Sequence, residues 1–160
     1  KEQSDTINII KTFYLKFPQY RWFTFRDLRG LSEKEFANSL RDCFVSVWMD
    51  EQSGFGTFPL ESMASGVPVI GKVPYIQPDW MNEDNGVWVT NPTLMCDFIA
   101  DFIQNWLEDN IKTELYENMK KTVEKYTNKQ EFDSNVTTLF GGYLTVRANS
   151  FEEQISKTEE

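Results

Sequence analysis

The segment from Asp50 to Gly71 carries the residues whose types and spacing best suit ligand chemistry. It reads DEQSGFGTFPLESMASGVPVIG, and Gly54 and Gly56 come just before an expected helix. Glycines let the backbone approach a ligand closely, and the free amides of a helix start favour an anion. Glu61 would lie one turn into that helix, where its carboxylate could accept hydrogen bonds from sugar hydroxyls. The pattern is typical of a site for an anionic ligand that carries hydroxyl groups.

A purely structural interpretation of this segment stays open on spacing alone. An acid such as Glu61 also complements the helix dipole, and the two glycines also suit an ordinary turn. The absence of histidine from the sequence narrows the chemistry. Ser-His, Cys-His and His-metal mechanisms are excluded within this chain, so the chemistry must use carboxylates, backbone amides, hydroxyls or the bound substrate.

The composition indicates one globular domain with an acidic balance. The chain has 160 residues, of which 40% are hydrophobic, and its formal charge is -9. That charge argues against nucleic acid as a partner and against a polybasic membrane surface. Cys43 and Cys96 lack CxxC spacing and suit buried small side chains rather than a disulfide or metal pair. No apolar run is long enough to span a bilayer, and a cytoplasmic location is expected.

The elements around the segment alternate between strands and helices. Nearly continuous apolar runs predict buried strands, and apolar residues at helical spacing predict helices. Strands are predicted at residues 21–25, 44–49, 67–70 and 86–90. Helices are predicted at residues 5–17, from Ser32, from near Phe58 to Gly66, and in the stretches 94–106, 111–126 and 132–144. Such alternation requires crossover connections, so the predicted fold class is α/β, a Rossmann-like parallel sheet with helices on both faces.

Three further positions have side chains that suggest a local role. Ser32 and Glu35 have the spacing of a capping box at a helix start. Trp80, in a proline-rich loop, could stack on a base, but more simply pins its loop to the core. Lys72 closes a predicted strand and could meet a phosphate, although we expect it to be solvated.

The stretch SGFGTFPLESMASGVPVIG resembles the donor-site signature of retaining GT-B glycosyltransferases of the family 4-like type (group 1). That signature reads E-G-F-G-x-x-x-L-E-A-M-A-x-G-x-P-V-I. The order, the spacing and the strand-helix-strand context all agree, and Asn85-Gly86 followed by VWV is similar to the turn after the signature. Looser similarity extends over residues 23–107. The matching positions are Gly54, Phe55, Gly56, Leu60, Glu61, Met63, Ala64, Gly66, Pro68, Val69 and Ile70.

The resemblance implies a donor site for a nucleotide-diphosphate sugar. Glu61 corresponds to the second glutamate of the signature, which binds the ribose hydroxyls. Arg29 and Gly30 follow the RWFTF stretch, where such enzymes hold the nucleobase. The implied donor-binding residues are Gly54, Phe55, Gly56, Thr57, Leu60 and Glu61, of which the first four form a loop whose amides face the donor sugar and its diphosphate.

One position departs from the family. Ser53 stands where the first glutamate of the signature touches the donor sugar. Glu51 and Asp50 lie nearby and could replace it, although their register differs by two and three residues. Glu51 and Ser53 are therefore the candidate catalytic, sugar-contacting residues. The departure leaves a second hypothesis open, a non-enzymatic or degenerate sugar-nucleotide-binding or scaffold domain. A third, a Rossmann-like dinucleotide binder, lacks its GxGxxG fingerprint.

The resemblance also implies an organisation. The chain corresponds to the C-terminal half of a GT-B fold, truncated at its start and without the acceptor half. Residues 1–130 would form the donor-binding domain, 131–150 a helix that packs back on the missing half, and 151–160 a charged tail. The full-length parent, a bacterial protein, would transfer a hexosyl group with retention, whereas the fragment alone would be inactive.

The family resemblance sets the expected partners as well. The donor is the one small molecule expected, with no cofactor and no metal, and the acceptor is not identified. Peripheral attachment of the full-length protein to the inner membrane is compatible with the sequence. A sheet edge exposed by truncation predicts pairing between two copies of the chain.

Overall fold

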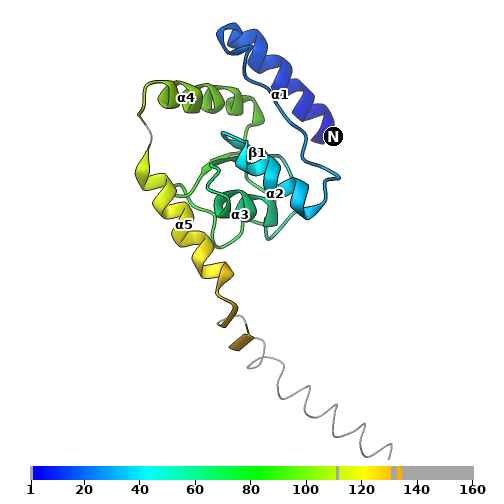
Figure 1. Cartoon of the computed structure of the whole chain (residues 1–160). Helices are drawn as coiled ribbons and strands as arrows, with labels where there is room; N and C mark the ends of the chain where they lie inside the picture. Colours follow the sequence, from blue (N-terminus) through cyan, green and yellow to red (C-terminus); the bar gives the residue numbers. More distant parts are fainter. Residues whose placement is uncertain (1, 111, 131–132, 135–160) are drawn as a thin grey trace, which may run out of the picture. The chain divides into compact units, whose positions relative to one another are not determined.

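The computed structural model describes residues 2–110, 112–130 and 133–134 (Figure 1). The chain divides into two compact units, Lys1–Val123 and Glu124–Glu160, and the first holds every candidate site residue. The predicted segments 131–150 and 151–160 and the predicted helix 132–144 lie outside the described residues, apart from positions 133 and 134. The elements are α1 Glu2–Lys16, η1 Pro18–Tyr20, α2 Glu33–Arg41, β1 Ser46–Trp48, α3 Thr57–Ala64, β2 Val69–Lys72, β3 Val87–Val89, η2 Pro92–Leu94, α4 Met95–Leu107 and α5 Thr113–Thr127.

The three strands form a parallel sheet in the order β1-β2-β3, which confirms the predicted α/β class. Ser46 pairs with Val69, and Ile70 pairs with Val87. The central strand β2 is the most deeply buried, because Val69 and Ile70 are both fully inaccessible to solvent. Parallel strands place their carboxyl ends at one edge of the sheet, where open α/β sheets bind ligands. The residues after β1 and at the end of β2 therefore share that edge.

Helices cover both faces of this sheet. Figure 1 shows α1 and α4 on one side and α3 on the other. Side-chain hydrogen bonds tie α1 and η1 to α4, since Cys96 Sγ donates to the Ile9 carbonyl at 3.4 Å and Tyr20 Oη donates to Gln104 Oε1 at 2.8 Å. Both cysteines are free thiols, and burial raises their pKa. The core of buried residues consists of Ile9, Phe13, Tyr20, Ile70, Val89, Met95, Cys96, Ile99, Ala100 and Ile103.

The predicted strand at residues 21–25 is wrong, because the structure assigns no strand there. Its aromatic side chains pack on α1 instead, with the rings of Phe23 and Phe25 centred 6.1 and 5.4 Å from that of Phe13. The Tyr14 hydroxyl donates to the Phe23 carbonyl at 2.6 Å and so takes an acceptor that a sheet would use. An extended segment becomes a strand only where a neighbouring strand pairs with its backbone.

The predicted capping box of α2 is confirmed. The Ser32 amide donates to Glu35 Oε2 at 2.9 Å, and the Glu35 amide donates to Ser32 Oγ at 3.4 Å. Hydrogen bonds from Ser32 lower the pKa of Glu35. No helix within the described ranges combines the length and the apolar character that crossing a membrane requires.

Candidate functional site

The loop between β1 and α3 is shaped by its own polar side chains. Asp50 Oδ1 accepts hydrogen bonds from the amides of Gln52 and Ser53, at 2.8 and 3.2 Å. Ser53 Oγ in turn accepts from the Gly56 amide at 3.1 Å. Such short side-chain bonds hold a loop in a single turn conformation. Ser53 therefore contributes to the shape of the loop at the position where the family signature has a glutamate.

Position 56 requires a glycine, both because of its backbone conformation and because of the side chains that surround it. Its φ of 72° lies in the left-handed region, and it precedes α3 as the N-cap. A Cβ atom at this position would lie 2.9 Å from Trp80 Cζ2 and 3.5 Å from Trp48 Cη2. The loop therefore lies directly on tryptophan rings, and a side chain at position 56 would separate them.

Trp80 anchors the loop between β1 and α3. Its ring is only 4% exposed, and its Nε1 donates to the Phe55 carbonyl at 2.8 Å. Trp80 also packs edge-on against Trp88, with ring centroids 5.7 Å apart. Asn85 supports the arrangement, because its Nδ2 donates to the Trp80 carbonyl at 2.6 Å. The structure thus confirms that Trp80 anchors its proline-rich loop in the core. The Asn85-Gly86 turn contributes to this packing.

We expect Trp80→Phe to lower the free energy of unfolding by about 1 to 2 kcal/mol, because the Phe55 carbonyl loses its donor. Urea titration followed by circular dichroism measures this change. The matched control is Trp22→Phe, since the Trp22 side chain is 57% exposed, and it should shift stability by less than about 0.5 kcal/mol. Equal losses in the two variants would contradict the proposed anchoring.

The start of α3 presents backbone donors next to the loop. The amides of Thr57 and Phe58 precede the first helical hydrogen bond, from the Leu60 amide to the Gly56 carbonyl at 3.4 Å. Leu60 is 8% exposed and packs inward. Glu61 is exposed, and within the described part of the chain its carboxylate has no hydrogen-bond or ion-pair partner. An unpaired carboxylate one turn into α3 is available to a ligand.

The expectation that Lys72 is solvated is wrong, because Lys72 forms an ion pair with Glu51. Each of the two side chains is only 16% exposed. The Glu51 carbonyl also accepts from the Tyr75 amide at 3.0 Å. The pair joins the residues that follow β1 to the last residue of β2, at the carboxyl edge of the sheet. Glu51 is therefore engaged by Lys72 rather than free in the loop.

A double-mutant cycle should show this pair as a strong coupling. Lys72→Met and Glu51→Gln should each lower the free energy of unfolding, with a coupling energy of about 1 to 3 kcal/mol, because each single change leaves a mostly buried charge without its partner. The more exposed pair of Lys16 and Asp97 is the matched control and should couple by less than about 1 kcal/mol. Purely additive effects of Lys72→Met and Glu51→Gln would show that the pair is not formed in solution.

The predicted nucleobase residues lie in a separate turn between η1 and α2. Arg29 Nε and Nη2 donate to the Asp27 carboxylate at 3.0 and 2.5 Å, and the hydrogen bonds from Arg29 lower the pKa of Asp27 to about 2. Gly30 follows with a φ of 73°. The structure thus keeps Arg29 and Gly30 together in an exposed turn, and their role in holding the base stays a prediction.

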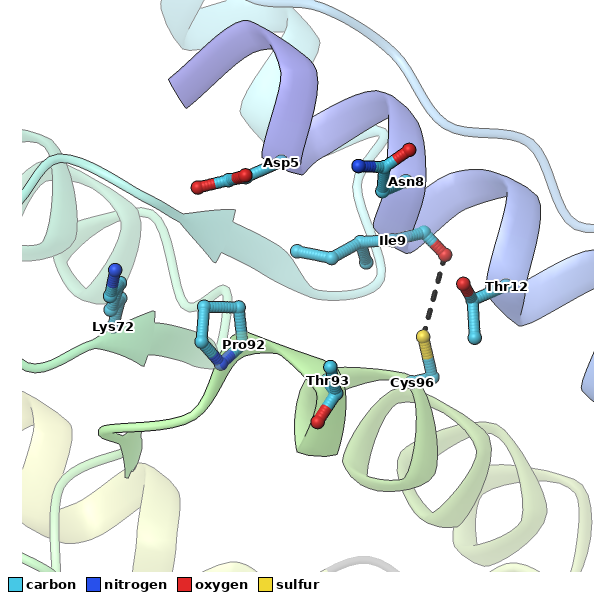
Figure 2. Close-up of a pocket in the computed structure, with 8 residues that line it drawn as sticks. All are labelled: Asp5, Asn8, Ile9, Thr12, Lys72, Pro92, Thr93 and Cys96. Atoms are coloured by element: carbon cyan, nitrogen blue, oxygen red, sulfur yellow. Dashed lines mark hydrogen bonds between the residues drawn. The ribbon is translucent and has the colours of Figure 1, made fainter. Parts of the chain in front are cut away.

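Several residues near the carboxyl edge of the sheet carry no sequence signal for a functional site. Lys72 does carry one, because a lysine that closes a buried strand lies at this edge. We nevertheless expected its side chain to face solvent. Asp5, Asn8 and Thr93 line a cavity beside Lys72 (Figure 2). No sequence pattern marks these three residues, because they come from α1 and η2, far from the glycine loop in the chain.

Comparison with known proteins agrees with this geometry. The family model for "Glycosyl transferases group 1" matches residues 28–126, which is more than half of the chain. A curated protein described as "Alpha-1,6-glucosyltransferase", from Actinobacillus pleuropneumoniae serotype 7 (strain AP76), is 24% identical over 153 residues. The match covers 88% of this chain and 44% of that relative, so the chain spans less than half of the relative's length. No solved structure matches the chain. With the glycine loop, α3 and the parallel sheet in place, the family match shows that this chain belongs to the group 1 glycosyl transferases.

Proposed function

We propose that this chain is the donor-binding part of a retaining glycosyltransferase that uses a nucleotide-diphosphate sugar. The observation that carries the proposal is the unpaired carboxylate of Glu61, one turn after a glycine loop that Trp80 and Ser53 hold in place. Glu61 would accept hydrogen bonds from the two ribose hydroxyls of the donor. The family match and the glucosyltransferase relative support glycosyl transfer, and transfer of a hexosyl group is the specific form we propose.

In the proposed reaction the bond between the anomeric carbon and the diphosphate oxygen breaks, and a hydroxyl of the acceptor forms the new bond. Negative charge grows on the departing diphosphate. The amides at the start of α3, including those of Thr57 and Phe58, would stabilise that charge. The loop allows close approach at Gly54, because that exposed glycine leaves the backbone uncovered, whereas Gly56 is buried against the tryptophan rings. Positioning and electrostatic stabilisation then supply the catalysis.

The acceptor would be bound by the rest of a longer protein, and we expect the isolated chain to bind the donor without turnover. A titration of the chain with UDP, GDP, ADP and NAD tests the binding step. Trp80 and Trp48 lie against Gly56, so their fluorescence reports on the loop directly. Saturable binding of one nucleoside diphosphate, but not of NAD, is expected. Preferential binding of NAD would instead support a dinucleotide-binding domain.

A specific observation favours a second candidate, a sugar-nucleotide-binding domain without transferase activity. Ser53 bonds to the Gly56 amide and Glu51 pairs with Lys72, so neither residue offers a free carboxylate at the sugar-contact position of the family. An assay of sugar transfer by the full-length protein discriminates the two candidates. Transfer with the native Ser53 would eliminate the non-enzymatic alternative. Transfer only after Ser53→Glu would establish it.

A further inference from the structure

Asn85 is a fully buried polar side chain at the turn that precedes β3. Its exposed fraction is 0%, and a buried amide is tolerated only where hydrogen bonds replace those lost to water. Its Nδ2 donates to the Trp80 carbonyl at 2.6 Å and to Thr122 Oγ1 at 3.0 Å. Its Oδ1 accepts from the Asn82 amide at 3.2 Å and from Trp88 Nε1 at 3.3 Å. Both donors and both lone pairs of the amide group are therefore used.

Thr122 extends this network to α5. Its hydroxyl donates to the Asn118 carbonyl at 2.8 Å, one helical turn earlier, so the lone pairs of Oγ1 are left to accept from Asn85. The Asn118 side chain adds a second bond, because its Nδ2 donates to the Asp84 carbonyl at 3.4 Å. Both contacts lie within the first compact unit, which ends at Val123. Two side chains thus attach α5 to the turn that contains Asn85.

Trp80 connects this turn to the glycine loop. Asn85 holds the backbone of Trp80, whereas the indole Nε1 of Trp80 donates to the Phe55 carbonyl at 2.8 Å. The Trp80 ring also lies against Gly56, where an added Cβ would be only 2.9 Å from Cζ2. Three hydrogen bonds in series therefore form a relay that leads from Thr122 through Asn85 and Trp80 to the loop.

The glycine loop depends on this support, because its own side chains are small or exposed. Gly54 has no side chain, and Phe55 is 51% exposed, whereas Trp80 is almost completely buried. A displacement of Trp80 would move the Phe55 carbonyl and, with it, the amides of the loop that would face the donor. A ligand binds most tightly to a loop that is already held in the binding conformation, so such a displacement lowers the affinity.

We propose that Asn85 and Thr122 are positioning residues of the donor site, which hold the glycine loop in its binding conformation through Trp80. The inference rests on the proposed function, because the loop is the segment that would meet the donor diphosphate. Asn85 and Thr122 act on the donor through Trp80 rather than by direct contact. The relay also gives α5 a part in donor binding, although α5 lies outside the signature segment.

Two variants of Thr122 test the relay in the ligand-free chain. Thr122→Val removes the hydroxyl and leaves one Nδ2 donor of Asn85 without its acceptor, whereas Thr122→Ser keeps the hydroxyl. In the ¹⁵N-labelled chain, Thr122→Val should shift the signals of the Trp80 indole Nε1–H and of the Gly56 amide. Thr122→Ser should leave both signals near their native positions. Trp80→Phe identifies the indole signal by removing it.

The affinity for the nucleoside diphosphate that binds the native chain best is the second readout. Isothermal titration calorimetry should show binding weakened about threefold to tenfold in Thr122→Val and retained in Thr122→Ser. Asn85→Asp removes both Nδ2 donors and should weaken binding by about tenfold to thirtyfold. Asn38→Asp makes the same change at an exposed position on α2 and should bind as the native chain does. If Asn85→Asp does not fold, the two variants of Thr122 are sufficient for the test.

A further control distinguishes positioning from a general loss of stability. Tyr20→Phe removes the hydrogen bond to Gln104 that joins η1 to α4, and it should lower the thermal midpoint about as much as Thr122→Val does. Its nucleotide affinity and its Trp80 indole signal should stay native. Equal losses of affinity in Tyr20→Phe and Thr122→Val, or an unmoved Trp80 indole signal in Thr122→Val, would overturn the proposal.

The failure of this inference and the failure of the proposed function give different results. If the native chain binds none of UDP, GDP and ADP, the proposed donor site is rejected, and the ligand-free signals of Trp80 and Gly56 decide whether the relay holds the loop. If the native chain binds a nucleotide and Thr122→Val binds it equally well, the donor site is supported and the positioning role is rejected.

Discussion

Replacing Glu61 by alanine should lower the affinity for a nucleoside diphosphate by about tenfold to a hundredfold and leave the fold intact. A hydrogen bond to a charged group contributes about 1.5 to 3 kcal/mol, and the proposed contact with the two ribose hydroxyls involves such bonds. The thermal midpoint should stay unchanged, because the exposed Glu61 carboxylate has no partner within the described residues. Isothermal titration calorimetry measures the affinity, and differential scanning calorimetry measures the midpoint.

Two variants make this experiment specific. Glu83→Ala removes another exposed carboxylate from the first unit and should bind the nucleotide as the native chain does. Glu61→Gln keeps the size of the side chain and removes its charge, so its affinity should lie between those of the native chain and Glu61→Ala. Native affinity in Glu61→Ala would exclude Glu61 as the residue that binds ribose.

Gly56→Ala is expected to have the largest effect on stability. A residue with a side chain at a φ of 72° costs about 1 to 2 kcal/mol, and overlap of the new Cβ with Trp80 at 2.9 Å adds about 1 to 3 kcal/mol. The Trp80 ring must then move, and the bond from its Nε1 to the Phe55 carbonyl is disturbed. Urea titration of the variant measures the combined loss of unfolding free energy.

Gly66→Ala is a close control for this change. Gly66 has a φ of 75°, nearly that of Gly56, but no atom lies within 4 Å of the position of an added Cβ. The two variants therefore share the backbone cost and differ in contact with the tryptophan rings. We expect Gly66→Ala to lose about 1 to 2 kcal/mol and to keep nucleotide binding. An equal loss in both variants would show that the loop does not press on Trp80.

Much of the fold could be predicted from the sequence because its signals are local. The capping box of Ser32 and Glu35 depends on a spacing of three residues. The strands β1, β2 and β3 lie within predicted apolar runs or overlap them, and the helix that starts at Thr57 follows directly after the glycine loop. These short-range patterns, together with the alternation of strand and helix, were enough to predict the parallel sheet.

Features that depend on distant partners were not predictable in this way. The aromatic run at residues 21–25 has the composition of a strand, but its aromatic rings pack against Phe13 on α1 and the segment joins no sheet. The burial of Lys72 depends on its ion pair with Glu51, which lies in the loop between β1 and α3. The cavity beside Lys72 likewise combines α1 with η2, and no spacing within either element marks it.

The central claim is that the glycine loop and the start of α3 form the donor site. The most direct measurement is a map of amide chemical shifts as the ¹⁵N-labelled chain is titrated with the nucleoside diphosphate that binds it best. We predict saturable shifts at Gly54, Gly56, Thr57 and Glu61, together with a shift of the Trp80 indole Nε1–H. Shifts confined to other parts of the chain, or no saturable shifts with UDP, GDP or ADP, would contradict this account.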